Sequence, residues 1–379
     1  MIPDSRLTYR IAFSSLRGMT LSLARTMLPR VVDEATFFTA SSRQLAAMMG
    51  TGSRLFDDDY RRSVLAAARR EVDFILDHNV TPVYWADEAY PRRLLNCDDA
   101  PVMLYVSGDT DLNSPHILSI VGTRHATSYG TGFISTLLPD LASRIDGLVI
   151  VSGLAYGIDV AAHSASLAAS VPTVGVLAHG LSTIYPAAHR SIAADMVRRG
   201  GMVLTDYRHD SPVHRGNFLA RNRIIAALAD ATLVVESAEK GGAIVTARIA
   251  QTYCRDVFAL PGRVVDPYSR GCNRLISTHV AQAVQDATDV ITSLRWTERP
   301  VLGSQQQLFA ASAPALSPDE SSVVTYLTSN PDASLNPMAV ALNIPVHRLM
   351  AMLVDLEFQG IIRALPGGRY RLSSPLTIN

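Results

Sequence analysis

The chain has 379 residues, 48% hydrophobic and 18% charged, which suits a globular protein of two or three domains, and its formal net charge of +0 excludes a general attraction to nucleic acid. No apolar run is long enough to cross a membrane, and the first residues, MIPDSRLTYR, contain no export signal. Three widely separated cysteines (Cys97, Cys254 and Cys272) form neither a disulfide framework nor a metal motif, which predicts a reducing, cytoplasmic environment.

Residues 1–80 are predicted to form a small helical domain. Apolar residues recur at helical spacing in YRIAFSSLRGMTLSLARTMLP, SSRQLAAMMG and DDDYRRSVLAAARREVDFILDHN. The LRGMTLSLAR segment resembles the hairpin of helix-hairpin-helix or SAM-like modules, although the second glycine of that hairpin is missing. A domain that serves only for packing is therefore an equal alternative. Two β-like runs, TPVYW and PVMLYVSG, follow.

Residues 81–295 are predicted to form an extended Rossmann-like domain, an α/β fold with a doubly wound parallel sheet. Six apolar runs begin at residues 117, 148, 173, 202, 232 and 256, and helix-compatible residues follow each of the first five. Strands that are buried on both faces and joined by crossover helices form a parallel sheet covered on both sides.

Residues 296–315 are predicted to be a linker, and residues 316–379 a winged-helix domain. Ser317 and Glu320 form a capping-box pattern, with Pro318 at the first helical position. We expect helices over residues 318–329, 337–342 and 346–359, and then a hairpin across Gly367-Gly368. Helix, helix–turn–helix and hairpin, in this order, are typical of a winged helix.

Glycines and basic residues follow the predicted parallel strands, at the edge of the sheet where ligands bind in such folds. Gly122-Thr123-Arg124 follows the first strand, and Ser152 and Gly153 follow the second. Backbone N–H groups beside glycine, a helix N-terminus and an arginine side chain all favour a phosphate. Tight turns with a surface arginine are the alternative. Asp159 is predicted to cap the following helix, and His163 is interpreted as structural.

The segment after the fourth strand, PVHRGNFLARNRIIAALAD, combines basic residues with an aromatic side chain. Such interleaving is typical of single-stranded nucleic-acid binding, because cations follow the phosphates and the ring stacks on any base. In the alternative, the ring packs in the core and the arginines are solvated. The residues concerned are Arg215, Asn217, Phe218, Arg221 and Arg223.

A pair of glycines follows the fifth strand, next to the single lysine of the chain. The chain has 34 Lys and Arg residues, of which only Lys240 is a lysine, next to Gly241 and Gly242. Two glycines at the start of a helix again predict an anion site. A glycine turn with an incidental lysine is the alternative.

These blocks together resemble the DprA (Smf) family of bacterial DNA-processing proteins. The resemblance rests on GTR, SGLAYGID, GLSTIYP, FLARNRIIAALAD, KGGAIVTARIA, RDVFALPG and GCNRLI, in this order over roughly residues 85–290. It implies single-stranded DNA binding, dimerisation through the Rossmann-like domain and loading of the RecA recombinase in natural transformation. The family's DNA-contacting positions fall on Arg124, Arg215, Phe218, Lys240, Gly241 and Gly242.

Three short departures from the family pattern put local loop geometry in doubt. Gly241-Gly242 stands where Ser-Gly is usual, Thr205-Asp206 where Ser-Glu is usual, and Gly271-Cys272-Asn273 where Gly-Thr-Asn is usual.

We predict a non-catalytic protein without metal or cofactor. The sequence presents no carboxylate cluster, no Cys/His set and no nucleophile with an evident base. The main alternative is a Rossmann enzyme that processes nucleotides by N-glycosidic or phosphate chemistry, but its PGGxGTxxE-type motif is missing. A further alternative is a duplex-binding regulator, which the acidic residues Asp355 and Glu357 in the candidate recognition helix disfavour.

Overall fold

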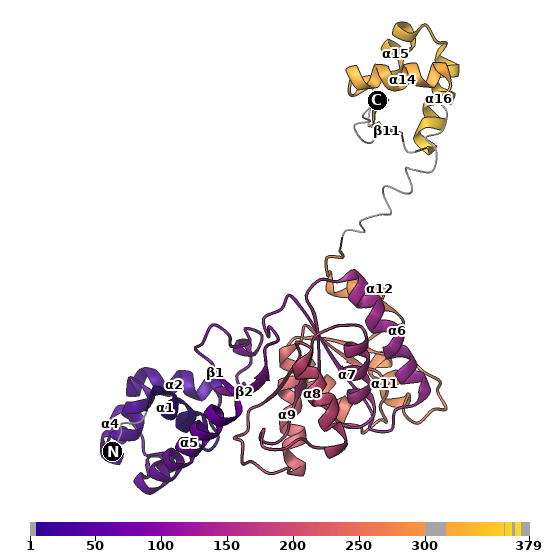
Figure 1. The fold of residues 1–379 in the computed structure, drawn as a ribbon. Coiled ribbons are helices and arrows are strands. Elements are labelled where there is room, and N and C mark those ends of the chain that lie inside the picture. The colour runs from indigo at the N-terminus through magenta and orange to yellow at the C-terminus, as the bar shows by residue number, and fades with distance from the viewer. Residues whose placement is uncertain (1–4, 300–315, 360, 366–367, 373–379) are drawn as a thin grey trace. The chain divides into compact units, whose positions relative to one another are not determined.

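A computed structural model describes residues 5–299, 316–359, 361–365 and 368–372 (Figure 1). The chain divides into two compact units, Met1–Arg299 and Pro300–Asn379. Residues 300–315, the larger part of the predicted linker, lie outside the described residues.

The first unit begins with helices that surround an aromatic core, as the sequence predicts for this part of the chain. Phe13 and Phe37 are fully buried and meet edge to face, with ring centroids 5.6 Å apart. The same core includes Tyr84 and Tyr105 of the neighbouring strands, so these helices share one hydrophobic cluster with the sheet. The helices are α1 (Arg6–Ser14), α2 (Leu21–Val31), α3 (Glu34–Thr39), α4 (Ser42–Met49) and α5 (Asp58–His78).

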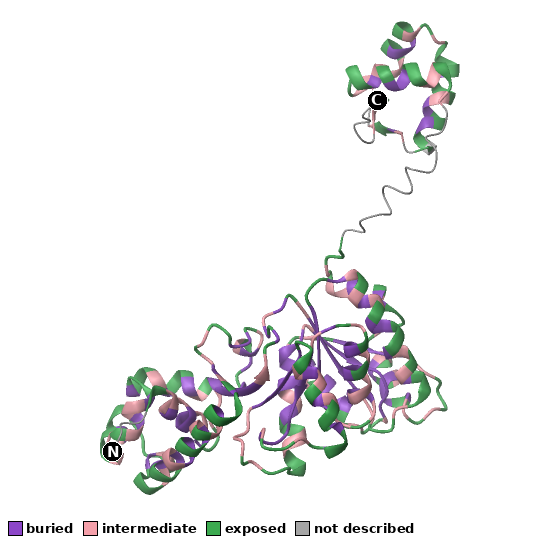
Figure 2. Cartoon of the chain, in the orientation of Figure 1, coloured by how far each residue is buried: buried purple, intermediate pink, exposed green. Residues whose placement is uncertain are grey.

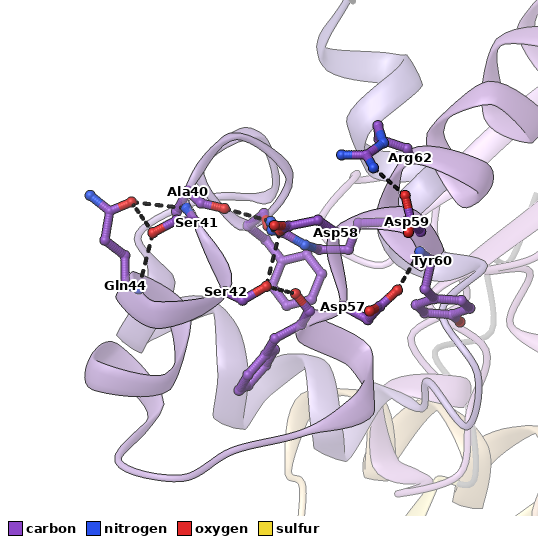
Figure 3. Close-up of polar contacts among 12 residues, drawn as sticks. Ala40, Ser41, Ser42, Gln44, Asp57, Asp58, Asp59, Tyr60 and Arg62 are labelled. Atoms are coloured by element: carbon purple, nitrogen blue, oxygen red, sulfur yellow. Dashed lines mark hydrogen bonds and ion pairs between the residues drawn. The ribbon is translucent and has the colours of Figure 1, made fainter.

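Short polar side chains define the ends of α4 and α5 (Figure 3). Ser41 and Gln44 form a capping box at the start of α4. The Ser42 hydroxyl donates to Oδ1 of Asp58 at 3.0 Å, which ties the start of α4 to the start of α5. Asp57 caps α5 by accepting a hydrogen bond from the Tyr60 N–H at 2.8 Å. The long helix α5 is thus anchored at its N-terminus.

A nine-stranded sheet forms the centre of the first unit, in the order β1-β2-β6-β5-β4-β3-β7-β8-β9. Strands β3 to β9 pair in parallel, whereas β2 pairs antiparallel with β6 and with β1. The six predicted strands are confirmed, and β1, β2 and β9 extend the sheet at its edges. The strands are β1 (Thr81–Tyr84), β2 (Met103–Gly108), β3 (His116–Val121), β4 (Leu148–Ser152), β5 (Thr173–Val176), β6 (Met202–Thr205), β7 (Ala231–Val234), β8 (Asp256–Ala259) and β9 (Gln282–Ala283).

Helices cover both faces of the sheet, which confirms the doubly wound fold. Side chains alternate along β3: Ile117 and Val121 join the cluster under α9, α10 and α11, whereas Leu118 and Ile120 join the cluster under α6, α7 and α12. Figure 2 shows the strands buried between helices whose outer faces are exposed. The helices are α6 (Ser128–Arg144), α7 (Ile158–Ala168), α8 (Arg190–Arg198), α9 (Arg215–Leu228), α10 (Gly242–Thr252), α11 (Arg270–Ser277) and α12 (Ala287–Leu294), and short 3-10 turns occur at Arg54–Phe56, Leu94–Asn96 and Ala187–His189.

The second unit has the elements of the predicted winged helix. Helices α14 (Pro318–Ser329), α15 (Leu335–Leu342) and α16 (Val346–Phe358) enclose a small apolar core. Ser317 and Glu320 form the predicted capping box. Strands β11 (Ile362–Leu365) and β12 (Arg369–Leu372) form the predicted antiparallel hairpin, and β10 (Ala333–Ser334) pairs with β12. Gly367 of the predicted turn lies outside the described residues.

Helix α16 exposes several apolar side chains, and its one arginine is ion-paired. Val346, Met350 and Val354 are each more than 40% exposed, and Arg348 forms an ion pair with Asp319 of α14 at 2.8 Å.

Across the described part of the chain, no single helix is long and apolar enough to span a membrane. Helices α15 and α16 reach that length and composition only jointly, and they are bent by 110° relative to each other.

Candidate nucleic-acid interface

A cavity of about 670 Å³ opens at the carboxyl ends of the central strands. Strand β3 lies between β4 and β7, so the strand order reverses there along the chain. In open α/β sheets, ligands bind at such a reversal, where loops from neighbouring strands separate. Residues from the loops after β3, β4, β5 and β7 and from α9 line the cavity. It is therefore the first candidate for the functional site.

The loop after β3 is held rigidly and presents one arginine to solvent. A side chain at Gly122 would meet Ile158 and come within 2.9 Å of the Glu236 carbonyl oxygen, so only glycine fits. The Thr123 N–H donates to that carbonyl at 2.6 Å, and the Thr123 carbonyl accepts from the Ile158 N–H at 3.1 Å. Arg124, the next residue, is exposed. Its guanidinium carbon lies 5.5 Å from the centroid of the Phe218 ring, which is a cation–π contact.

Helix α9 brings a second arginine and an aromatic ring to the same cavity. Arg215 is the exposed first residue of the helix, and Phe218 is partly exposed on its next turn. Residues three apart lie on the same helical face, so both point to the cavity, and both line it. Tyr185, from the loop after β5, lies against Phe218 with ring centroids 5.9 Å apart.

Helix α10 begins at the cavity with two glycines. Gly241 is the N-cap, and a side chain there would collide with the Ser237 hydroxyl and come within 3.1 Å of the Ala238 carbonyl oxygen. Its φ of −72° shows that close approach, rather than a left-handed turn, requires the glycine. Gly242 has open space around it. Lys240 is exposed in the preceding turn, beside the cavity.

The helix N-termini around this cavity differ in what fills them. Helices α9 and α10, both wholly within the described ranges, have no acidic residue in the first turn. At α6, by contrast, the buried carboxylate of Glu236 accepts hydrogen bonds from the N–H and the hydroxyl of Thr127, at 2.9 and 2.6 Å. The partial positive charge at the start of a helix attracts anions. That charge is open to a ligand at α10 and is already neutralised at α6, whereas at α9 the His214 side chain accepts a hydrogen bond from the Gly216 N–H at 3.2 Å.

Comparison with known proteins assigns the chain to one family. The model of the DNA recombination-mediator protein A family matches residues 81–295, and the model of the DprA winged-helix domain matches residues 307–368. The chain belongs to the DNA recombination-mediator protein A family. Protein Smf of Escherichia coli K12 is 34% identical over 302 residues, which cover 78% of each chain. DNA processing protein DprA of Bacillus subtilis is 36% identical over 232 residues, which cover 61% of this chain and 74% of that one.

Two solved structures of this DprA family resemble the present one. The X-ray structure of DprA from Streptococcus pneumoniae superposes with a TM-score of 0.63 and 29% identity, covering 77% of this chain and 98% of that one. DprA from Helicobacter pylori, whose structure addresses the single-stranded DNA binding mode of that protein, gives a TM-score of 0.51 at 32% identity. It covers 57% of this chain and 95% of that one.

The structure brings together most of the residues that the sequence selects in this DprA-family chain. The predicted residues that line the cavity are Gly122, Thr123, Arg124, Arg215, Phe218, Arg221, Gly241 and Gly242. Asn217, in the first turn of α9, and Lys240 lie beside it. Their contact with DNA stays a prediction.

The predicted contacts of Ser152, Gly153 and Arg221 are wrong, because all three are committed to the interior. The Ser152 side chain is fully buried and donates to the Ile120 carbonyl at 2.6 Å. Arg221 is 4% exposed and donates to the carbonyls of Gly153, at 2.7 Å, and Val176. A side chain at Gly153 would come within 2.5 Å of this guanidinium. The Arg221 side chain therefore links the carboxyl ends of β4 and β5 through their backbone carbonyls.

Arg223 is likewise held by contacts within the protein. This residue lies outside the cavity and forms an ion pair with Asp206 at 2.5 Å, while it donates to the Asp99 carbonyl at 2.6 Å. Arg221 and Arg223 are two positions apart in the helix, so the two side chains leave α9 in different directions. A helical segment can present only part of an arginine-rich sequence to one ligand.

The prediction that Asp159 caps α7 is wrong, because the helix begins at Ile158 and Asp159 lies within its first turn. Gly157 is the N-cap, and Asp159, 7% exposed, accepts from the Ala155 N–H at 3.3 Å. Burial raises the pKa of this carboxyl above its usual value, and the positive charge of Arg221 opposes the shift. Burial also lowers the pKa of Arg221 to about 10, and Asp159 opposes that shift. The opposite charges of Asp159 and Arg221 thus partly offset the cost of burying each group.

His163 is structural, as the sequence predicts. Its ring is fully buried, and Nδ1 is 2.7 Å from the Thr173 hydroxyl. Burial lowers the pKa of His163 to about 3, so the ring is neutral at neutral pH.

Tyr185 is the site residue that the sequence analysis missed. It is 46% exposed and contributes a second ring to the cavity rim. An exposed aromatic residue before Pro186 in a loop after a predicted strand was the available signal, but the position of Tyr185 beside Phe218 depends on the path of that loop.

Proposed function

We propose that this protein binds single-stranded DNA, without regard to its sequence, along the carboxyl edge of the central strands. The observation that carries the proposal is the contact between Arg124 and Phe218 at the rim of the cavity, which the start of α10 also lines. The N-terminus of α10 and two exposed arginines favour phosphates, and an accessible ring favours a base.

The arrangement suits a strand with splayed bases better than a duplex. Arg124 comes from the loop after β3 and Arg215 from the first turn of α9, the helix that carries Phe218, so neighbouring phosphates can be held while a base covers the ring. Stacking on an aromatic ring is tolerant of base identity, because every base offers a flat face. A duplex keeps its bases paired and stacked, so it gives Phe218 nothing to contact. The preference for single strands therefore follows from the accessible ring of Phe218.

The family membership supports the wider role. The H. pylori relative is described by its single-stranded DNA binding mode, and the family as a recombination mediator. We extend these properties to this chain: it delivers single-stranded DNA to the RecA recombinase in natural transformation or recombination, acts as a homodimer through the Rossmann-like sheet and works in the cytosol. The winged helix serves protein contacts, since α16 presents exposed apolar residues and a single arginine that is already paired with Asp319.

We further propose that the protein is not a nucleotide-processing enzyme. In Rossmann enzymes the helix after the first parallel strand of the sheet receives the nucleotide phosphates at its N-terminus. Here α6 occupies that position, and the Glu236 carboxylate fills its N-terminus. A phosphate there would meet a buried negative charge instead of free N–H groups.

The decisive test compares gel shifts of single-stranded and duplex oligonucleotides of equal length and several sequences. We expect a clear preference for single strands, near-equal affinity for all sequences and a steep loss of affinity with salt, because neutralised phosphates release counterions. Equal affinity for duplex, or an affinity that salt does not change, refutes the proposal. Hydrolysis of a nucleotide by the purified protein would favour the enzyme instead.

A further inference from the structure

The segment that leads into α9 has no regular secondary structure. Residues 206–214 connect β6 to α9, and they determine where Arg215 and Phe218 stand. Val213 of this segment itself lines the cavity. An irregular segment cannot hold its own conformation through a ladder of backbone hydrogen bonds, so external contacts must fix it.

His209 is the residue through which this segment is held. Its backbone N–H donates to both carboxylate oxygens of Glu71 in α5, each at 3.0 Å, and its ring Nδ1 is 2.6 Å from Oε2 of the same carboxylate. The ring also stacks on Phe74, with centroids 4.3 Å apart and planes 10° from parallel. One residue of the segment is thus bonded by backbone, ring nitrogen and ring face to a helix of the N-terminal part.

The other side of the segment is tied to the loop that carries Tyr185. The His209 carbonyl accepts from the Ser182 hydroxyl at 2.6 Å, and the Ser211 carbonyl accepts from the Gly180 N–H at 3.0 Å. A side chain at Gly180 would collide with the carbonyl oxygens of Arg208 and His209, so the two loops are in close contact. Movement of His209 would displace both partners of the aromatic pair.

Glu71 has no role in the site described above, yet it is an acid with 1% exposure. Burying a carboxylate is unfavourable unless hydrogen bonds satisfy it. Burial raises the pKa of Glu71, and the hydrogen bonds from His209 oppose that rise. A buried acid that accepts three hydrogen-bond contacts from one residue of a distant loop is a specific anchor rather than a general packing residue.

We propose that Glu71 and His209 position the start of α9, so that helices α1–α5 contribute to DNA binding without touching the DNA. The inference rests on the proposed single-stranded DNA binding and assigns positioning residues to that site. The N-terminal helices are then part of the binding device, since the hydrophobic cluster they share with β1 and β2 holds α5 against the sheet.

Hydrogen bonding accounts for the arrangement of Glu71, His209 and Asp210 better than a bound metal ion does. Glu71, His209 and Asp210 form the one group within the described ranges whose ligand-type atoms lie close enough to share a metal, within 4.8 Å. However, the Glu71 oxygens already accept the His209 hydrogen bonds, and Asp210 is 3.4 Å from Arg208. A cation would displace the hydrogen bonds between His209 and Glu71. It would also compete with Arg208 for the Asp210 carboxylate.

The test measures affinity for a fluorescent single-stranded oligonucleotide in full-length Glu71→Ala, Glu71→Gln and His209→Phe proteins. Loss of a buried network of this kind predicts an affinity about tenfold lower for Glu71→Ala, with a smaller loss for the other two. Gln can still accept the backbone N–H of His209, and Phe keeps the stacking on Phe74. Glu34→Ala, which removes a second buried acid of the N-terminal helices, is the matched control and should keep wild-type affinity.

Two readouts separate positioning from general destabilisation. Amide hydrogen exchange of Glu71→Ala should speed up over residues 206–218 and stay unchanged in α10. In an Arg215→Ala background, Glu71→Ala should weaken binding by less than it does in the wild-type protein, because one of the two side chains that it positions is gone.

Three outcomes overturn the inference while leaving the proposed function intact: wild-type affinity in Glu71→Ala, full additivity of Glu71→Ala with Arg215→Ala, or loss of wild-type affinity after EDTA treatment, which would reveal a metal. Failure of the wild-type protein to bind single-stranded DNA would instead refute the proposed function.

Discussion

Replacement of Phe218 by alanine distinguishes a DNA-stacking ring from a core ring. Phe218 is partly exposed and contacts Arg124 and Tyr185 at the cavity rim, at 5.5 and 5.9 Å. Loss of a stacking ring weakens binding by about 1–3 kcal/mol per base stacked, which corresponds to roughly 5- to 150-fold. Truncation of a fully buried phenylalanine destabilises a protein by about 3–5 kcal/mol. Because Phe218 is not fully buried, we expect the free energy of unfolding to fall by less than that.

The assay combines fluorescence anisotropy with a labelled single strand and urea unfolding of the same preparations. Phe218→Leu is the matched control, since it keeps an apolar side chain but removes the ring. We expect both variants to lose DNA affinity, and only Phe218→Ala to lose measurable stability. Wild-type affinity in Phe218→Ala, together with a strongly lowered melting temperature, would show that the ring belongs to the core and that the reasoning is wrong.

Three further predictions concern charge and domain organisation. Arg221→Met should lower the free energy of unfolding by about 3–5 kcal/mol in urea titrations, since the buried carbonyls of Gly153 and Val176 lose their donor and Asp159 its counter-charge; unchanged stability would contradict this role. A chain that ends at Arg299 should bind single-stranded DNA within about tenfold, or 1.4 kcal/mol, of the full chain, and a larger loss would place the main site in the second unit. Lys240→Ala should weaken binding to all sequences alike and reduce the salt slope by about one unit, with part of the affinity restored by Lys240→Arg; a wild-type salt slope would mean that the exposed lysine touches no phosphate.

The sheet and the winged helix could be predicted from the sequence because local patterns specify them. Near-continuous apolar runs such as ILSIVG are buried on both faces wherever they pair, so they identify parallel strands without knowledge of their neighbours. The Ser317–Glu320 capping box likewise acts within one turn of a helix. Strand order could not be predicted: β2 pairs antiparallel with β6, a strand about a hundred residues away, through backbone hydrogen bonds that carry no sequence code.

What the sequence by itself determined about the site is its chemistry: glycine-bearing loops, arginines and one phenylalanine after parallel strands, all at one edge of a sheet. Only the tertiary structure decided which arginines are available. Arg215, Arg221 and Arg223 are near neighbours in the sequence, yet Arg215 is exposed, Arg221 is buried under β4 and β5, and Arg223 is paired with Asp206. The physical reason is that a side chain's partners depend on the direction in which it leaves the helix and on what distant segments place there. A guanidinium that meets buried carbonyls or a carboxylate satisfies its donors inside the protein, and one that meets water keeps them for a phosphate.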